Sequence, residues 1–162
     1  IATHDGFTRK LTLFSRYRDD TGALRLKKDG PLTLVDGRLI DDAVVEREAH
    51  WTESFRPVDW DRDGLLDLVY ACAGAEAGKG SIFLLRNAGT ASSPVFEAPR
   101  TFPCFGQPIY VSAHGPHPWP GDLDGDGLPD LLACVEWSVY PFYTHAALEM
   151  NVRPEFSLEL VE

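Results

Sequence analysis

The feature that most constrains this chain is an acidic segment that occurs twice, with a constant spacing of 63 residues. Residues 57–69 read PVDWDRDGLLDLV, and residues 120–132 read PGDLDGDGLPDLL. The two segments align without a gap, so that Asp59 corresponds to Asp122. A repeat at such a spacing predicts an architecture in which similar units stack side by side and share their cores.

Similarity also extends beyond the acidic segments. Residues 81–83 (SIF) resemble 138–140 (SVY), and residues 94–96 (PVF) resemble 154–156 (PEF). At the N-terminus, residues 11–14 and 37–40 align with 82–85 and 106–109, so residues 1–40 read as the second half of a unit. The chain is therefore expected to hold about two and a half units of roughly 60 residues, at 1–50 (partial), 51–113 and 114–162.

Each unit has the composition of β structure, because short aliphatic and aromatic runs alternate with Gly, Pro and Asp clusters. Four short antiparallel strands per unit are typical of a β-propeller blade. The fold class predicted is therefore all-β, with an incomplete ring of blades unless the chain is part of a longer one or several copies assemble. The expected strands are 52–58, 66–72, 81–87 and 94–102, then 115–121, 130–135, 138–144 and 155–161, whereas 41–50 is either a helix or a loop.

The repeated motif Asp-x-Asp-x-Asp-Gly-x-x-Asp indicates a site for a hard cation such as calcium, which prefers six to eight oxygen ligands. Carboxylates at alternate positions of a tight loop converge on one point, and the glycine permits the sharp turn. An EF-hand is excluded, because its position 12 needs Glu, where this chain has Tyr70 and Ala133. The predicted ligands, including the carbonyl of the seventh position, are Asp59, Asp61, Asp63, Leu65 and Asp67 in one loop and Asp122, Asp124, Asp126, Leu128 and Asp130 in the other.

The net charge and the hydropathy of the chain argue against two classes of partner, nucleic acid and the membrane interior. The net charge is −10, which disfavours nucleic acid, since phosphate binding needs a basic face. The two loops hold eight of the 25 acidic residues, so much of the acidity is local to the expected metal sites. No apolar run approaches the ~20 residues of a membrane-spanning helix, and no membrane span is expected.

The two Asp loops, the strands that follow them and the segment RNAGTASSPVF at 86–96 resemble the FG-GAP/VCBS repeats. These repeats build the propellers of integrin α-subunits, of propeller lectins and of many secreted bacterial proteins. The resemblance implies calcium in the loop between the first and second strands of each complete blade, which gives two structural sites here. It also implies that other blades of the same propeller are partners, and that the protein is secreted, periplasmic or at the cell surface.

A second group of residues is expected at the opposite end of the blades, where aromatic rings stand beside His and Arg. Such rings suit a sugar, which stacks its CH faces and hydrogen-bonds through its hydroxyls. The interpretation is a calcium-stabilised module that binds carbohydrate or an extracellular protein. The alternatives are a catalytic propeller such as a polysaccharide lyase, a scaffold without a ligand, or simple packing of the rings between blades. The candidate ligand-binding residues are His50, Trp51, Tyr110, His114, His117, Trp119 and Trp137.

Overall fold

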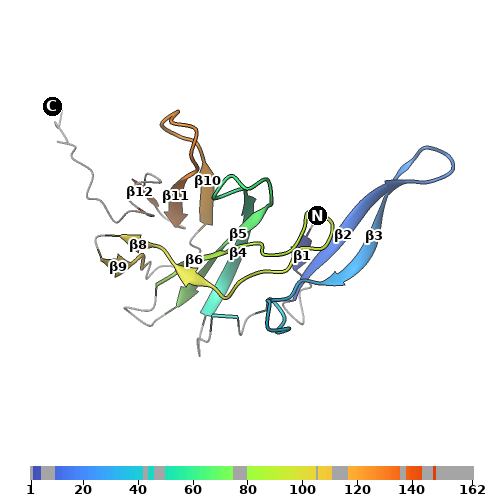
Figure 1. Ribbon diagram of the computed structural model, residues 1–162. Coiled ribbons are helices and arrows are strands. Elements are labelled where there is room, and N and C mark those ends of the chain that lie inside the picture. Colours follow the sequence, from blue (N-terminus) through green and yellow to red (C-terminus); the bar gives the residue numbers. More distant parts are fainter. Residues whose placement is uncertain are drawn as a thin grey trace.

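We analysed a computed structural model of the chain, which describes residues 2–4, 10–41, 44–45, 50–74, 80–104, 106–110, 117–135, 138–143 and 148. All elements whose bounds are described are β-strands (Figure 1), and all pairs of these strands are antiparallel; residue 148 is helical. This confirms the predicted all-β class with partial propeller blades. No described helix is long and apolar enough to cross a membrane.

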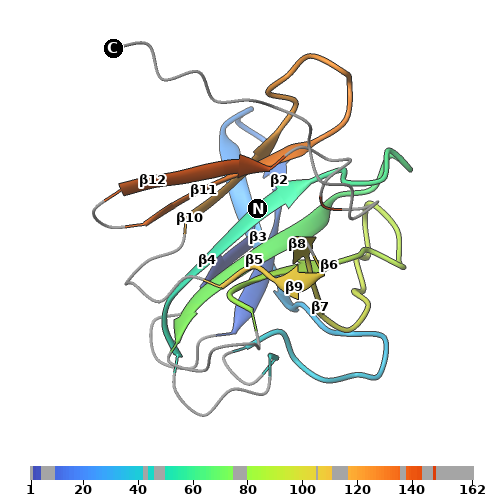
Figure 2. The same cartoon turned by 90° about the vertical axis from the view of Figure 1, so that its left-hand side faces the viewer.

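The strands form three blade-like sheets and one small hairpin, and each sheet is a meander in which consecutive strands are neighbours (Figures 1 and 2). The N-terminal sheet contains β1 (Ala2–His4), β2 (Leu11–Arg18) and β3 (Leu24–Pro31). The middle sheet contains β4 (His50–Val58), β5 (Asp67–Gly74), β6 (Ile82–Leu85) and β7 (Arg100–Thr101). The last sheet contains β10 (His117–Gly121), β11 (Asp130–Val135) and β12 (Ser138–Tyr143), and β8 (Pro103–Cys104) pairs with β9 (Gln107–Pro108).

The middle sheet is buried on both faces, which explains why β5 and β6 read as continuous apolar runs. Alternate residues of each strand enter two different cores. On the face toward the N-terminal sheet, the first core contains Leu68, Tyr70, Cys72, Phe83 and Leu85 together with Leu11, Leu32, Leu34 and Ile40. On the face toward the last sheet, the second core contains Trp60, Val69, Ala71, Ile82, Leu84, Phe102 and Ile109 together with Leu131, Ala133 and Leu148.

The N-terminal sheet repeats the pairing of the second half of the middle sheet. Thr12 of β2 pairs with Thr3 and Pro31, just as Phe83 of β6 pairs with Tyr70 and Thr101. The strands β1, β2 and β3 therefore correspond to β5, β6 and β7.

The segments that follow these strands also correspond. The N–H of Ile40 donates to the carbonyl of Leu32 (3.0 Å), and the N–H of Ile109 donates to that of Phe102 (3.3 Å), the residue equivalent to Leu32. The aligned positions 37–40 and 106–109 thus lie in equivalent places. The sequence predicted that residues 1–40 form the second half of a unit. It did not show that this unit also contains the second of the four strands, which is β1.

One strand expectation differs from the structure, and another is not tested by it. The fourth strand of the middle unit, expected over 94–102, is confined to Arg100–Thr101, because the preceding segment folds back through turns around Asn87. The fourth strand expected at 155–161 lies outside the described residues. In the 41–50 segment, the described residues at 41, 44 and 45 are not helical, and His50 begins β4.

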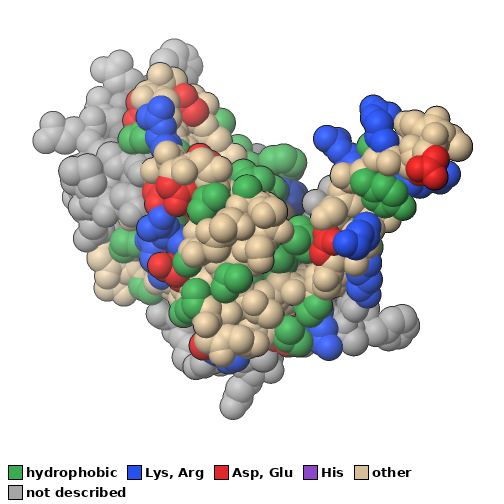
Figure 3. All heavy atoms as spheres, turned by 45° about the vertical axis from the view of Figure 1, so that its right-hand side comes forward, with side chains coloured by type: hydrophobic (Ala, Val, Ile, Leu, Met, Phe, Trp, Pro, Cys, Tyr) green, Lys and Arg blue, Asp and Glu red, His purple; other side chains and the backbone are tan. Residues whose placement is uncertain are grey.

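The hairpin of β2 and β3 projects from the body of the molecule (Figure 1), and no strand bounds were predicted for these residues. The turn explains its length. The side chain of Asp19 accepts hydrogen bonds from the N–H groups of Thr21 and Ala23 (both 3.0 Å), and Gly22 adopts φ 81°. Figure 3 shows Lys and Arg side chains along this hairpin, and its outer half is exposed on both strands.

A leucine in the second core and a leucine on the exposed hairpin should contribute very differently to the free energy of unfolding. Replacing Leu84, which is fully buried, with Ala should lower the free energy of unfolding by about 2–5 kcal/mol, because it leaves a cavity between two sheets. The same change at Leu24, which is 55% exposed on the hairpin, should cost less than about 1 kcal/mol. Urea denaturation of both variants checks this, and equal losses would contradict the assignment of the core.

Candidate metal centre

The first acidic loop connects β4 to β5 and brings three of its carboxylates together. One oxygen from each of Asp59, Asp61 and Asp63 lies within 4.8 Å of the others. The loop is held in this shape by its own backbone. The N–H of Gly64 donates to Asp59 (3.0 Å), and the N–H of Leu65 donates to Asp63 (2.8 Å). Three negative charges are therefore concentrated at the loop, with backbone dipoles as partial compensation.

Asp67, the last residue of the motif, has a different position from the other three. Its carboxylate is fully buried and accepts the N–H of Trp60 (3.0 Å) through one oxygen and the N–H of Asn87 (2.7 Å) through the other. Burial raises the pKa of this carboxyl above its ordinary value, against the opposing effect of the two backbone donors. Asp67 thus anchors the start of the loop to the end of β6.

The second loop, between β10 and β11, repeats this arrangement. Asp130 is fully buried, and one of its oxygens accepts the N–H groups of Leu123 (2.9 Å) and Asp124 (3.2 Å). Asp122 accepts the N–H groups of Gly125 (2.7 Å) and Gly127 (3.0 Å). Oxygens of Asp122, Asp124 and Asp130 lie within 4.8 Å of one another. Both copies of the motif therefore form compact oxygen-rich loops, as the spacing predicted.

In both loops, the backbone conformation at the sixth position of the motif explains why a glycine stands there. Gly64 and Gly127 each adopt φ 86°, in the left-handed region that side chains with a Cβ avoid. At the fourth position the two loops differ. Gly125 has φ 82°, whereas the corresponding Arg62 adopts φ 64° despite its side chain, so the first loop carries backbone strain that the second does not.

An arginine that the motif does not contain approaches the first loop. The guanidinium of Arg86, which follows β6, forms an ion pair with Asp61, and its Nη2 lies 3.5 Å from Asp63. In the last unit, Tyr143 pairs with Leu131 as Leu85 pairs with Leu68, so the position after it is Thr144, which carries no charge and lies outside the described residues. The first loop therefore has a positively charged side chain beside its carboxylates, that of Arg86.

A bound metal would fit these loops. Asp59 Oδ1 is buried and has no hydrogen-bond partner among the described residues, which is costly unless a cation satisfies it. The donor set consists of carboxylate oxygens, which calcium prefers. The residues that the structure brings together for a cation are Asp59, Asp61 and Asp63 in one loop, and Asp122, Asp124 and Asp130 in the other.

The remaining predicted ligands have other roles in the loop geometry. Asp126 accepts the N–H of Leu128 (2.7 Å), as Asp63 accepts that of Leu65. Both carboxylate oxygens of Asp67 are engaged by backbone donors. Coordination by Asp67, by Asp126 and by the carbonyls of Leu65 and Leu128 stays a prediction.

The predicted ligand-binding residues are only partly described. His50 and Trp51 lie at the start of β4, where side chains are not described, and His114 and Trp137 fall outside the described residues. Tyr110 is 37% exposed, His117 is half-buried at the start of β10, and Trp119 is 53% exposed in the middle of that strand. The guanidinium of Arg56 stacks over the ring of Trp119, 4.6 Å from its centroid. A ligand site formed by these predicted residues stays a prediction.

Sequence reasoning missed two residues that shape the first loop, Arg86 and Asn87. The Asn87 side chain donates to the carbonyl of Leu66 (3.3 Å) and accepts the N–H groups of Gly89 (3.0 Å) and Val95 (3.3 Å). It thus joins the loop to the segment after β6. The signal was present in the stretch 86–96, which was interpreted as a mark of resemblance and not as part of the site.

The buried position of Asp67 predicts a loss of stability that does not depend on metal. Asp67→Ala should lower the free energy of unfolding by about 2–4 kcal/mol, because two backbone N–H groups lose their acceptor. The loss should be similar in calcium and in chelator. Chemical denaturation in both buffers measures it, with the exposed Asp20→Ala as the control. A loss confined to calcium would show that Asp67 acts as a ligand and not as an anchor.

Comparison with known proteins agrees with this geometry. Residues 59–133, which run from the first acidic loop through the second and into β11, match the family model described as FG-GAP-like repeat. Neither the search of curated proteins nor the search of solved structures returned a match. The sequence of the two loops, the blade-like sheets and the family match agree with one another: residues 59–133 are similar to the FG-GAP-like repeats.

Proposed function

We propose that this chain is a calcium-stabilised β-propeller repeat module, with one structural calcium ion in each acidic loop. The observation that carries the proposal is the convergence of three carboxylates in both loops, together with the buried, unpartnered oxygen of Asp59. Without a cation, these carboxylates repel one another. With calcium, the loop between the first two strands of the blade becomes a rigid link, and binding free energy adds to the stability of the fold.

The calcium role supports a location outside the cytoplasm. Extracellular calcium modules bind at about 10⁻⁴ to 10⁻³ M, which matches the millimolar calcium outside cells. We therefore propose that the protein is secreted, periplasmic or at the cell surface. The remaining blades of the propeller are the partners that a repeat module implies.

For a ligand, we propose a glycan or an extracellular protein, bound on the side away from the acidic loops. The support is the exposed aromatic surface at Tyr110 and at Trp119, whose ring also stacks with Arg56. Aromatic faces of this kind bind sugar rings by stacking. The lyase alternative depends on His114, outside the described residues, and no described contact favours it over binding.

Removing one carboxylate should abolish the calcium effect of its loop. In about 10 mM calcium, Asp124→Ala should lower the free energy of unfolding by about 1.4–2.7 kcal/mol, which is the linkage expected for a site of 10⁻³ to 10⁻⁴ M. In chelator the loss should be small, because Asp124 is exposed. Thermal unfolding in both buffers measures the difference, with Asp20→Ala as the matched control. Equal losses in both conditions would refute the metal role.

The ion pairs of Arg86 predict that the two acidic loops differ in their affinity for calcium. Calcium must displace or weaken the contacts of Arg86 with Asp61 and Asp63, so Arg86→Gln should raise the calcium affinity of the first loop severalfold. In chelator the same variant should be less stable, because the carboxylates lose their counter-ion. Calorimetric titration with calcium measures the affinity. Arg25→Gln, which breaks the exposed pair with Asp19, is the control and should leave calcium binding unchanged.

A further inference from the structure

The hairpin of β2 and β3 extends beyond the sheet to which it belongs. By strand register, Phe14 corresponds to Leu85, the last residue of β6, so the residues after Phe14 have no counterpart in the middle sheet. Five residues lead from Phe14 to Asp19 in the turn, which corresponds to about 16 Å of extended chain. Because β1 pairs with β2 only as far as Leu13, the outer part of the hairpin has two strands and exposes both faces.

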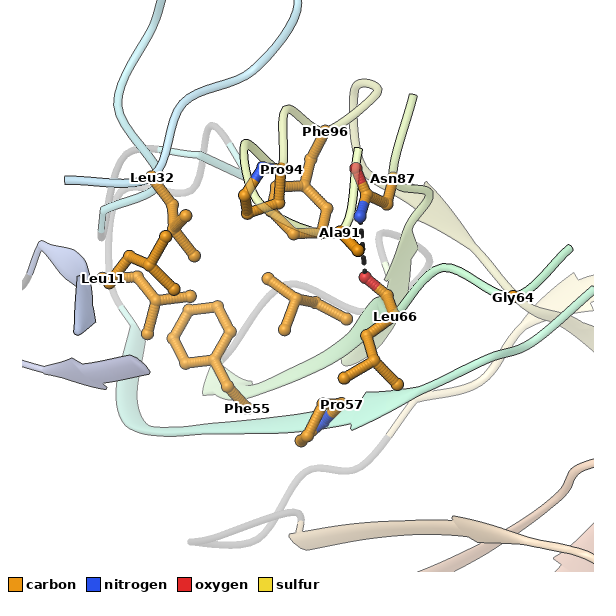
Figure 4. Close-up of a pocket in the computed structure, with 12 residues that line it drawn as sticks. Leu11, Leu32, Phe55, Pro57, Gly64, Leu66, Asn87, Ala91, Pro94 and Phe96 are labelled. Carbon is orange, nitrogen blue, oxygen red and sulfur yellow. Dashed lines mark hydrogen bonds between the residues drawn. The ribbon is translucent and has the colours of Figure 1, made fainter. Parts of the chain in front are cut away.

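The base of the hairpin shows how its two faces are oriented. Leu11 and Leu13 line an apolar cavity of about 470 Å³ between the N-terminal sheet and the middle sheet (Figure 4). Successive side chains of a strand point to opposite faces. Tyr17 therefore continues this inner face, which begins toward the middle sheet, whereas Arg16 and Arg18 lie on the opposite, outer face.

The outer face combines basic and apolar side chains. Across the two strands, Arg16 is paired with Leu26, and Arg18 is paired with Leu24. The two leucines are 53% and 55% exposed, and Figure 3 shows hydrophobic and basic side chains next to one another along the hairpin. By the same alternation, Lys28 also belongs to this face. The outer face thus consists of Arg16, Arg18, Leu24, Leu26 and Lys28.

The basic residues of the two faces differ in their partners. On the inner face, Arg25 forms an ion pair with Asp19 (2.7 Å), and Nζ of Lys27 lies 3.7 Å from a carboxylate oxygen of Asp29. On the outer face, none of the three basic side chains forms an ion pair within the described part of the chain. The outer face therefore presents uncompensated positive charge, although the whole chain has a net charge of −10.

This combination indicates the chemistry of a partner. Charge on an edge strand can by itself prevent pairing with another chain, but that role does not require exposed leucines. A protein interface usually has an apolar centre depleted of charge, whereas here each leucine stands opposite an arginine. The surface of an anionic bilayer suits both kinds of side chain. Long basic side chains reach the lipid phosphates, while neighbouring leucines enter the boundary with the acyl chains.

The acidity of the rest of the molecule does not prevent such an approach. Arg18 and Leu24, at the far end of the outer face, lie about 13 Å of extended strand beyond Phe14. The Debye length at physiological ionic strength is about 8 Å. Repulsion between a membrane at this end of the hairpin and the acidic loops is therefore largely screened.

We propose that the outer face of the β2–β3 hairpin docks on the surface of a membrane that contains anionic phospholipids. The contact is peripheral, because Leu24 and Leu26 reach only the boundary between headgroups and acyl chains. The docking goes beyond the proposed function. It is independent of calcium, since no carboxylate of the acidic loops takes part.

Co-sedimentation of the 162-residue protein with lipid vesicles tests the docking. One set of vesicles contains phosphatidylcholine with about 30% phosphatidylglycerol, and the other contains phosphatidylcholine alone. Chelator is present throughout, so that calcium cannot bridge the acidic loops and the lipid. The protein should bind the anionic vesicles and not the neutral ones. Raising the salt from about 0.1 to about 1 M should weaken binding, because it shortens the Debye length.

Charge variants distinguish the two faces. The double variant Arg16→Gln, Lys28→Gln should weaken binding to the anionic vesicles about thirtyfold, since each basic residue near the surface contributes about fivefold. The control Arg25→Gln, Lys27→Gln removes the same charge from the inner face and should change binding by less than about threefold. Circular dichroism checks that both variants keep the fold of the parent protein.

Apolar variants test the second half of the contact. Leu24→Ser combined with Leu26→Ser should weaken vesicle binding at least about tenfold, because less apolar surface enters the bilayer boundary. Tyr17→Ser removes an apolar side chain that is 50% exposed on the inner face, and it should leave binding unchanged.

Three results would overturn the proposal. The first is that anionic vesicles bind no better than neutral ones, and the second is that inner-face and outer-face variants lose equal affinity. The third is binding of polyglutamate, abolished by Arg16→Gln with Lys28→Gln, in the absence of vesicle binding. That result would assign the outer face to an acidic protein partner and not to a membrane.

Discussion

The structure depends on a carboxylate buried at the base of each acidic loop. Asp67 and Asp130 are fully buried, and each accepts backbone N–H groups from the beginning of its own loop. Asp67 also accepts the N–H of Asn87, and so ties three consecutive strands of the middle blade together at one end. This anchor holds the loop in a fixed shape before any metal binds. A cation that bound there would relieve the repulsion among carboxylates that are already in place.

The same anchor positions the side chain that packs between blades. The N–H of Trp60 donates to Asp67, and this fixes the direction in which the indole enters the second core. In the last unit, the corresponding Leu123 makes the same backbone contact with Asp130, yet its side chain is 52% exposed. In the described part of the chain, a neighbouring sheet packs over Trp60 and none packs over Leu123. Loop geometry and inter-blade packing are thus coupled in each unit, which is why propeller blades gain most of their stability from their neighbours.

The sequence predicted the elements whose signal is local and repeated. The two acidic loops, the strands that flank them and the partial N-terminal unit all follow from residue patterns that recur at nearly constant spacing. Elements that depend on non-local contacts were not predictable in the same way. The length of β3 depends on the turn at Asp19, and the short β7 depends on the fold-back around Asn87. The stretch 86–96 stood out in the sequence, but the ion pairs of Arg86 did not follow from it, because Asp61 and Asp63 lie more than 20 positions away in the chain.

The two loops also show how one motif can give two different sites. In the first loop, Arg86 supplies positive charge from the next strand connection, and Arg62 tolerates a left-handed backbone that a glycine provides in the second. The Arg62 guanidinium reaches the second loop, where a Cβ at Gly127 would lie 3.7 Å from its Nη1. The positive charge of Arg62 therefore lies beside the glycine turn of the second loop. Because charge compensation from the protein reduces what a metal ion can add, we expect the first loop, with its Arg86 ion pairs, to depend less on calcium than the second.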